Sequence, residues 1–421
     1  MSNTYRGQEP SPSWRSHPAV YVISGVAALS LFGDALLYSV LPLYAEELGI
    51  PFMAVGLILS MNRWVRLGTN PLAAKTYQKW DLFYPLLGAM ILTVISSFLY
   101  SRAWGVAVFL LARALWGLCW SHIRLGGFLV ILSTSGASLG LAVGTHHAVT
   151  RLGSAFTSII GSYFVDRGGY QRGLTIMTIL SALGIFLVLH LRRILPPSDH
   201  DPRQKDIQER LSPQAPPELS PIMCYLSGFV ISFVNAGMIV SSLSLVLQQR
   251  LGDLIQLGSW TFGIATISGV MLAVRWSSNL LISPLVGKLI DFGGRLKIFR
   301  FLTAAMIICL FIFASVFSPA VTVLTAVLLF FGGNSLEVVL DTAIGDTTYH
   351  GGAEKTTRIS RYNSFYDLGA ASGPVITYFL GSRIGFKWAF FLGAGLLLLL
   401  LLLEFLGMFP VSAQMQKTKS L

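Results

Sequence analysis

The stretch Gly287-Lys288-Leu289-Ile290-Asp291-Phe292-Gly293-Gly294-Arg295-Leu296-Lys297 lies between two long apolar segments. Its glycines permit the backbone of a tight turn, and its lysines and arginine make that turn basic. Asp291 is able to cap the start of a helix or to pair with an arginine of a neighbouring helix. An ordinary basic turn would account for the charges, but not for the glycines and the acid together. The stretch therefore predicts a specialised connection between two helices.

The composition around this stretch is strongly apolar. Of the 421 residues, 53% are hydrophobic and only 12% are charged, whereas about 25% are charged in an ordinary globular protein. A transmembrane helix needs roughly 20 apolar residues. The chain is therefore predicted to be an all-α integral membrane protein. The net charge of +11 comes from basic residues scattered between apolar segments, so it does not indicate binding to nucleic acid.

Apolar runs separated by polar breaks predict twelve membrane spans. They lie near 19–45, 52–73, 83–100, 105–131, 142–165, 173–191, 222–247, 258–286, 298–316, 320–342, 360–381 and 388–408. An even number places both termini on one side. The loops and tails of that side hold 18 of the 30 Lys and Arg residues, and the opposite loops hold 6. The positive-inside rule thus predicts cytoplasmic termini in a multi-pass protein of the cell (inner or plasma) membrane.

A polar stretch rich in proline and serine divides the chain in two. It covers 191–221 and predicts a cytoplasmic linker between an N-terminal six-helix bundle, 1–190, and a C-terminal six-helix bundle, 222–421. The two halves show an internal repeat. Pro71-Leu72-Ala73-Ala74-Lys75 recurs as Pro284-Leu285-Val286-Gly287-Lys288, and other short matches, Gly169-Tyr170 with Gly385-Phe386 among them, agree within three residues on the same offset.

The opening stretch resembles the loop signature of the major facilitator superfamily, Gly-x-Leu-x-Asp-x-x-Gly-Arg-x-Lys. The residues that carry the resemblance as a gating motif are Gly287, Asp291, Gly294, Arg295 and Lys297. The resemblance implies two six-helix bundles around a midplane cavity that opens alternately to either side and is lined by spans 1, 4, 7 and 10. In the first half, Ala74, Gln78 and Asp81 replace the Gly, Asp and Gly of this signature. The gating ion pair of that half is therefore unsupported.

Two charged residues of the first half are candidates for proton coupling. Arg113-Ala114-Leu115-Trp116-Gly117 in the fourth span resembles the family motif Arg-x-x-x-Gly, whose arginine faces the cavity and assists proton exchange. Asp34 in the first span is similar to the acid of proton-coupled multidrug antiporters. A buried carboxylate beside an arginine can be tuned to take up and release a proton. A structural ion pair that never titrates is the alternative.

The substrate cavity is expected to be lined by polar and aromatic residues of the same spans: Tyr38, Trp120, Asn235, Asn334 and Glu337. Asn334, Glu337 and Asp341 are spaced three and four residues apart, so they share one helical face. That face is suited to bind a substrate or a cation, or only to neutralise arginines. Neither reading is favoured by the sequence.

Further charges lie within apolar spans. An intramembrane charge costs several kcal/mol unless it meets water or a partner, so these residues are expected to form a charge network: Arg63, Arg66, Arg275, Asp341 and Asp367. Asp34 and Glu337 are further candidate partners for the arginines.

Small residues mark one late span. Gly369-Ala370-Ala371-Ser372-Gly373-Pro374 resembles the Gly-x-x-x-Gly-Pro pattern that antiporters of this family carry in their fifth span, where this chain has Thr157-Ser158 at the Gly-Pro position. Close packing of helices is the minimum expectation.

The most consistent function is proton-driven efflux of small organic molecules. No phosphate loop or hydrolase motif is present, so we expect no enzyme activity, no cofactor and no metal site. One proton that enters down 100 mV releases roughly 2.3 kcal/mol, enough for about a fiftyfold solute gradient. The alternatives are proton-coupled uptake of an anionic or zwitterionic metabolite and a transport-inactive receptor or scaffold. The expected partners are a small-molecule substrate, protons and the lipid bilayer, with the protein acting as a monomer.

Overall fold

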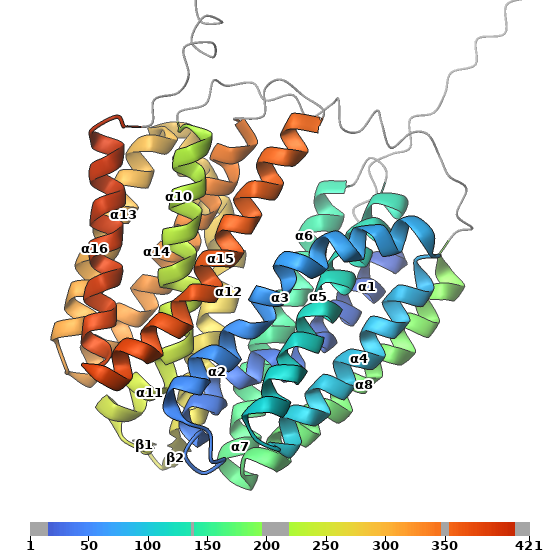
Figure 1. Cartoon of the computed structure of the whole chain (residues 1–421), viewed down its shortest axis with the longest axis horizontal. Helices are drawn as coiled ribbons and strands as arrows, with labels where there is room; N and C mark the ends of the chain where they lie inside the picture. Colours follow the sequence, from blue (N-terminus) through green and yellow to red (C-terminus); the bar gives the residue numbers. More distant parts are fainter. Residues whose placement is uncertain (1–15, 136–138, 196–218, 347–352, 409–421) are drawn as a thin grey trace, which may run out of the picture.

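The chain is described by a computed structural model that covers residues 16–135, 139–195, 219–346 and 353–408 (Figure 1). Its first half contains α1 (Pro18–Ser30), α2 (Phe32–Tyr44), α3 (Phe52–Lys79), α4 (Phe83–Arg102), α5 (Val106–Thr134), α6 (Leu139–Phe156), the π-helix η2 (Thr157–Gly161), α7 (Ser162–Gly168) and α8 (Tyr170–Ile194). Its second half contains α10 (Pro221–Ser232), the π-helix η3 (Phe233–Ile239), α11 (Val240–Leu251), β1 (Leu254–Leu257), β2 (Trp260–Gly263), α12 (Ile264–Gly293), α13 (Arg295–Ser315), α14 (Pro319–Asp346), α15 (Ala353–Arg383) and α16 (Phe386–Phe405).

Several of these helices continue one another. α1 continues into α2, α6 continues through η2 into α7, and α10 continues through η3 into α11, so the described residues form twelve helical spans. The predicted all-α fold of twelve helices is confirmed. The spans gather into a group from α1 to α8 and a group from α10 to α16, which lie side by side (Figure 1).

The least apolar spans lie where the two groups meet. Nine of the described spans are long and apolar enough to cross a membrane by composition alone; the other three are α3, α15 and the span from α6 to α7. α3 packs against α15, and α6 and α7 pack against α12. Polar residues are tolerated in these spans because they face protein rather than lipid.

Glycines with positive φ form several of the short turns. Gly169 (φ 81°) precedes α8 and Gly385 (φ 94°) precedes α16. Such a φ is unfavourable for a residue that carries a Cβ. These two positions are equivalent in the internal repeat, so the repeat preserves the shape of the turn as well as its sequence.

One connection differs from the expectation. Residues 254–263 form an antiparallel hairpin in which Leu254 pairs with Gly263 and Leu257 with Trp260. The eighth span therefore begins at Ile264, and the predicted start at 258 is wrong. A short apolar run does not distinguish a strand from the first turn of a helix, and Gly258, with φ 64°, lies in the two-residue turn of the hairpin.

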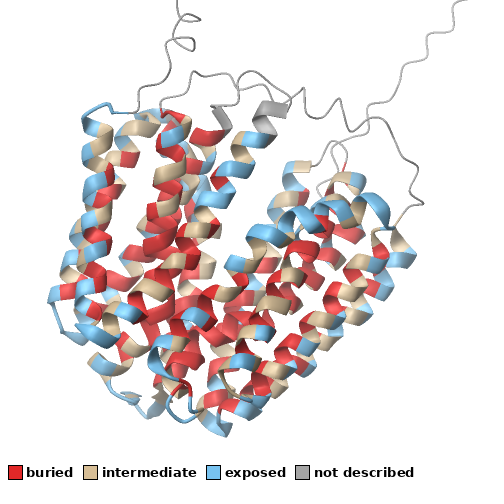
Figure 2. Cartoon of the chain, in the orientation of Figure 1, coloured by how far each residue is buried: buried red, intermediate tan, exposed pale blue. Residues whose placement is uncertain are grey.

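The two groups pack together from one end to the middle of the molecule and lie apart toward the other end (Figure 1). We call the end where they pack the outer end: it holds Tyr44, Gly168 and the hairpin, whereas the inner end holds Lys79, Ile194 and Pro221 (Figure 1). In α3 and α15 the residues toward the outer end are largely buried and those toward the inner end are largely exposed (Figure 2). α8 extends to Ile194, so its last four residues, 191–194, fall within the predicted linker; residues 196–218 of that linker and both chain ends lie outside the described residues.

Candidate functional site

Asp34 and Arg113 meet inside the first half. Helix α1 ends at Ser30, the C-cap Leu31 separates it from α2, and Asp34 lies in the first turn of α2. The indole Nε1 of Trp116 donates to the carbonyl of Ser30, 3.2 Å away, at this interruption. Arg113 on α5 is completely buried, and its Nη1 donates to Oδ1 of Asp34. The interruption of the first span thus places a carboxylate directly against a buried guanidinium.

Arg113 also binds the backbone of α3. Its Nε donates to the carbonyl of Ile58 at 3.0 Å, and its Nη2 donates to the carbonyl of Leu59 at 2.8 Å and to the hydroxyl of Tyr38 at 3.2 Å. All guanidinium nitrogens of Arg113 therefore have partners. The arginine connects α2, α3 and α5 through a single group.

The two carboxylate oxygens of Asp34 differ in their surroundings. Oδ1 accepts from Arg113 and, at 3.4 Å, from Nδ2 of Asn62. No hydrogen bond from a described residue reaches Oδ2, and Asp34 remains 7% exposed. Oδ2 is therefore the oxygen of Asp34 that has no hydrogen-bond donor among the described residues.

A second polar cluster lies in the other half. Oε1 of Glu337 accepts from the hydroxyl of Tyr366 at 2.6 Å and from Nδ2 of Asn235 at 3.3 Å. Asn235 also donates to Oδ1 of Asn334 at 3.3 Å, and Asn334 donates to the carbonyl of Arg275 at 3.0 Å. Sequence reasoning missed Tyr366, because an aromatic residue in an apolar helix gives no signal of its hydroxyl partner.

Asn235 reaches this cluster from the π-helical segment η3. A π-helical turn is wider than an α-turn and often marks a functional position. Close approach of η3 to α15 is possible because both carry glycine there: a Cβ on Gly237 would meet Gly373, and one on Gly373 would meet the carbonyl of Phe233. The small residues of the eleventh span thus serve close packing, as expected.

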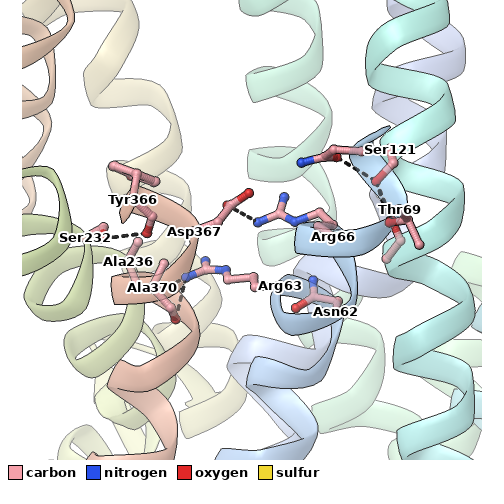
Figure 3. A network of polar contacts seen from close by, with 12 residues as sticks. Asn62, Arg63, Arg66, Thr69, Ser121, Ser232, Ala236, Tyr366, Asp367 and Ala370 are labelled. Carbon is pink, nitrogen blue, oxygen red and sulfur yellow. Dashed lines mark hydrogen bonds and ion pairs between the residues drawn. The ribbon is translucent and has the colours of Figure 1, made fainter. Parts of the chain in front are cut away.

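Two arginines of α3 cross to the second half (Figure 3). Nη2 of Arg66 pairs with Oδ1 of Asp367 at 2.6 Å. Nη1 of Arg63 donates to the carbonyls of Ala236 and Ala370, at 3.1 and 2.8 Å. The expectation of acidic partners is correct for Arg66 and wrong for Arg63, whose acceptors are backbone carbonyls.

A hydroxyl network secures the next turns of α3 against α5 (Figure 3). Ser121 donates to Oδ1 of Asn70 at 2.8 Å and lies 2.9 Å from Oγ1 of Thr69. α3 is therefore bonded to its own bundle on one side and to the opposite bundle on the other.

The remaining members of the predicted charge network do not join it. Within the described residues, no carboxylate lies at ion-pair distance from Arg275, whose guanidinium instead lies 4.5 Å from the ring centre of Trp276. Asp341 is exposed on α14 and forms no ion pair with a described arginine. Arg275 and Asp341 therefore form no ion pair among the described residues, although the charge of Glu337 acts on Arg275 and those of Arg124 and Arg151 act on Asp341. Helix spacing does not report how far a side chain reaches across a bundle.

The predicted cavity residues are mostly buried in this conformation. Tyr38 is 4% exposed, and Asn235 and Asn334 are fully buried. Their hydrogen bonds lie within the bundles, and only Oδ1 of Asn235 accepts none from a described residue. Trp120 stacks on Trp116, with ring centres 5.6 Å apart. Glu337 is half-buried. The expectation that all five line an open cavity is therefore wrong for Tyr38, Asn235 and Asn334 in this state.

The predicted gating motif forms the connection between α12 and α13. Gly287 and Asp291 lie in the last turns of α12, Gly294 (φ 78°) is the N-cap residue of α13, and Arg295 and Lys297 begin that helix. The tight turn is as expected. Asp291 does not occupy the cap position of α13, and its side chain lies outside the described residues.

The outer end is closed by contacts that the sequence did not reveal. Oδ2 of Asp166, at the end of α7, accepts from the backbone N–H of Thr266 at 2.7 Å and from its hydroxyl. Asp166 therefore caps the first turn of α12, a helix of the opposite half. A Cβ on Gly263 would collide with this carboxylate, and one on Gly269 with the carbonyl of Ser158. No sequence pattern connects residues that lie one hundred positions apart.

Aromatic rings and a small cavity complete the outer end. The ring of Phe52 on α3 lies 5.1 Å from that of Tyr378 on α15 and 5.7 Å from that of Phe386 on α16. A pocket of about 400 Å³ lies at the same end, lined by Tyr44, Asp166 and the hairpin residue Thr261 among others. At the outer end the halves thus meet through close-packed backbone, aromatic rings and the carboxylate cap of Asp166.

Twelve spans in two groups, with charged residues buried inside them, define a multi-pass membrane transporter. The family model described as Major Facilitator Superfamily matches residues 23–340 and 276–420. The chain belongs to this superfamily and is a transporter of small molecules, not an enzyme.

The relatives of this chain include drug exporters of bacteria. It is 25% identical over 372 residues to the "Multidrug resistance protein MdtG" of Rahnella sp. (strain Y9602), with 86% of each chain covered. It is 24% identical over 384 residues to MdtG of Escherichia coli (strain SMS-3-5 / SECEC), with 86% of this chain and 88% of the relative covered.

Solved structures share the fold. A bacterial homologue of the human lysosomal transporter Spinster, in an inward-facing and occupied conformation, matches with a TM-score of 0.74 at 12% identity over 96% of this chain and 98% of that one. A POT family transporter in complex with 5-aminolevulinic acid matches with a TM-score of 0.72 at 13% identity, over 92% and 95% of the two chains.

Proposed function

We propose that this transporter expels small organic molecules from the cell in exchange for protons, by alternating access. The observation that carries the proposal is the buried Asp34–Arg113 pair, in which one carboxylate oxygen has no described hydrogen-bond donor. The similarity to MdtG proteins over most of both chains supports export. We place the protein in the cell membrane as a monomer with cytoplasmic termini, an N-terminal bundle of 1–190 and a C-terminal bundle of 222–421.

The conformation described here corresponds to the inward-open state of this cycle. Contacts between the halves gather at the outer end, around Asp166, Gly269 and Phe52. Toward the inner end, the facing helices α3 and α15 are largely exposed. A substrate would enter from the cytoplasm, and the outer contacts would break when the inner end closes. We assign the motif around Asp291 and Arg295 to that inner closure.

Helix α3 supplies the physical link between the proton and the two halves. Protonation of Oδ2 removes the negative charge that holds Arg113. Arg113 also binds the backbone of α3 at Ile58 and Leu59, and α3 carries Arg63 and Arg66, which bind the opposite half. A change in the position of Arg113 therefore acts on the same helix that holds the halves together.

Everted membrane vesicles test this proposal. Respiration acidifies their lumen, and a pH-sensitive dye reports whether an added compound releases those protons. We expect lipophilic drugs to cause proton release and to accumulate in vesicles that carry the wild-type protein. Proton-independent accumulation, or none for any compound of a broad panel, would contradict proton-driven efflux.

Proton-coupled uptake of an anionic or zwitterionic metabolite is the second candidate. It is favoured by Arg275, a buried intramembrane arginine that has no carboxylate partner among the described residues. The two candidates differ in direction. Uptake would load right-side-out vesicles when the outside is acidic, whereas efflux would load everted ones.

A further inference from the structure

Two adjacent residues of α12 hold buried hydrogen-bond donors that no described group accepts. Nε of Arg275 and Nε1 of Trp276 are both shielded from solvent and have no partner. Arg275 is only 5% exposed, and none of its guanidinium nitrogens forms a hydrogen bond with a described residue. A buried donor without an acceptor costs free energy, more so when it is charged. The position is therefore suited to a ligand that brings acceptors.

The opposite half adds a second positive charge to this place. Arg151 on α6 lies with its guanidinium carbon 5.2 Å from the ring centre of Trp276, and that of Arg275 lies 4.5 Å from the same ring. No described carboxylate forms an ion pair with Arg151 or Arg275. Arg151 and Trp276 are half-buried, so the place is shielded but reachable. We call Arg151, Arg275 and Trp276 the arginine–indole site.

The site lies at a depth where a substrate would be held. Arg275 is eleven residues from the outer start of α12 at Ile264, about 16 Å along the helix axis, near the middle of the membrane. It also lies where α6 of one half packs against α12 of the other. A ligand bound here would contact both halves, as alternating access requires.

The nearby polar residues are already occupied. Glu337 accepts from Tyr366 and Asn235, and Asn334 donates to the carbonyl of Arg275 and to the hydroxyl of Ser278. These bonds fix the backbone of α12 around Arg275 without using its guanidinium. Glu337 acts on Arg275 through its charge without forming an ion pair. Among the described residues, the site therefore lacks an acceptor in direct contact with either guanidinium beside the aromatic surface.

We propose that the arginine–indole site binds the carboxylate of an amphipathic aromatic substrate. This inference rests on the proposed function, because it names the substrate class that the efflux pathway would take. A guanidinium offers paired N–H donors that match a carboxylate. The indole offers an apolar face for the ring of the substrate and one further donor. Two arginines from opposite halves would be drawn together by the same anion.

Binding of three matched probes to the purified transporter tests the site. 1-Naphthoate, 1-naphthamide and 1-naphthylmethylamine share one ring and differ in charge. Isothermal titration calorimetry in detergent, without a proton gradient, should give 1-naphthoate a dissociation constant about tenfold lower than that of the amide, with the amine weakest. Equal affinities for the three probes would overturn the proposal.

Charge-neutralising variants test whether the preference for 1-naphthoate arises at the arginine–indole site. Arg275→Gln and Arg151→Gln should each remove the preference for 1-naphthoate and leave the affinity for 1-naphthamide within about twofold. Arg102→Gln, which removes a charge at the exposed end of α4, should change neither. Because Arg275 is buried, its substitution can also disturb folding. The variant of the half-buried Arg151 therefore provides a second, independent test of the site. A preference that survives Arg151→Gln in folded protein would overturn the proposal.

A lipid headgroup would offer the same anionic chemistry. Titration with short-chain phosphatidylglycerol distinguishes this source: Arg151-dependent binding of that lipid in place of 1-naphthoate would overturn the assignment to substrate. The measurements are separate from those on efflux. A missing preference leaves proton coupling through Asp34 untouched, and a failure of proton coupling leaves the binding site untouched.

Discussion

Asp34 is held on one oxygen by the completely buried Arg113, and its other oxygen has no hydrogen-bond donor among the described residues. Asp34→Asn keeps an acceptor for Arg113 but cannot carry a proton. We expect this variant to lose proton-driven accumulation in everted vesicles and to retain exchange of labelled for unlabelled substrate. Asp253→Asn, at an exposed acid beside the hairpin, is the control. Active accumulation at the wild-type rate by Asp34→Asn would exclude Asp34 as the proton carrier.

Glu337 affects substrate charge from within its hydrogen-bonded cluster. Glu337→Gln preserves acceptors for Tyr366 and Asn235 and removes one negative charge. Binding of 1-naphthylmethylamine should weaken by roughly 1–3 kcal/mol, the range for a hydrogen bond to a charged group. 1-Naphthamide should be unaffected, and 1-naphthoate should bind as well or better. A uniform loss of all three in calorimetry would show instead that Glu337 only maintains the bundle.

The sequence predicted which residues carry charge inside the membrane better than it predicted their partners. Asp34, Arg113, Arg66 and Asp367 stand out because acids and arginines are costly in apolar spans, and the structure brings each pair together. Every residue has a backbone carbonyl, so the sequence does not indicate which carbonyls accept from Arg63. Arg151 and Arg275 both lie against the indole of Trp276 because the two halves pack together there. The spacing of residues along one helix gives no information about that packing.

At the scale of helices and strands, glycines set how closely the two halves approach at the outer end. A Cβ on Gly269 would collide with the carbonyl of Ser158 when that end is closed. Gly269→Ala should therefore penalise this state by roughly 1–3 kcal/mol, the usual cost of overpacking, and shift the protein toward outward opening. Asp166→Asn should shift it in the same direction, because it weakens the charged cap on α12.

Cysteine labelling measures this shift. Ala265→Cys, at a fully buried position at the outer start of α12, is introduced into a chain whose three native cysteines are replaced by alanine. We expect faster labelling from outside in both variants. Gly395→Ala, where an added methyl meets nothing within 4 Å, is the matched control. Equal rates in Gly269→Ala and Gly395→Ala would mean that backbone contact does not limit outer closure.

Helices were easier to predict than their irregularities. Long apolar runs and turn residues determine the twelve spans, because a spanning backbone must satisfy its own hydrogen bonds. The interruption at Leu31 and the π-turns of η2 and η3 were not predicted, since each depends on packing against neighbouring helices. η2 begins at the Thr157-Ser158 pair, which stands where the resembling antiporter pattern has Gly-Pro. A π-helical turn therefore occupies the position of that Gly-Pro pair.

At the scale of the whole molecule, orientation is the property most open to direct measurement. The excess of basic residues at the inner end predicts that this end faces the cytoplasm. A membrane-impermeant maleimide applied to intact cells should label Trp104→Cys, at an exposed position between α4 and α5, and spare Arg193→Cys near the end of α8. Permeabilised cells should show labelling of both. Labelling of Arg193→Cys alone in intact cells would invert the topology.

The backbone contacts of Arg63 bear on how such a protein can diversify. Its acceptors are the main-chain oxygens at Ala236 and Ala370, which every amino acid provides. Exchanges among small residues at these two positions would leave both bonds in place, whereas a residue at position 63 without a side-chain N–H donor would remove them. Neighbouring positions of the second half can therefore change in sequence without loss of these two bonds, which depend on the side chain of Arg63 alone.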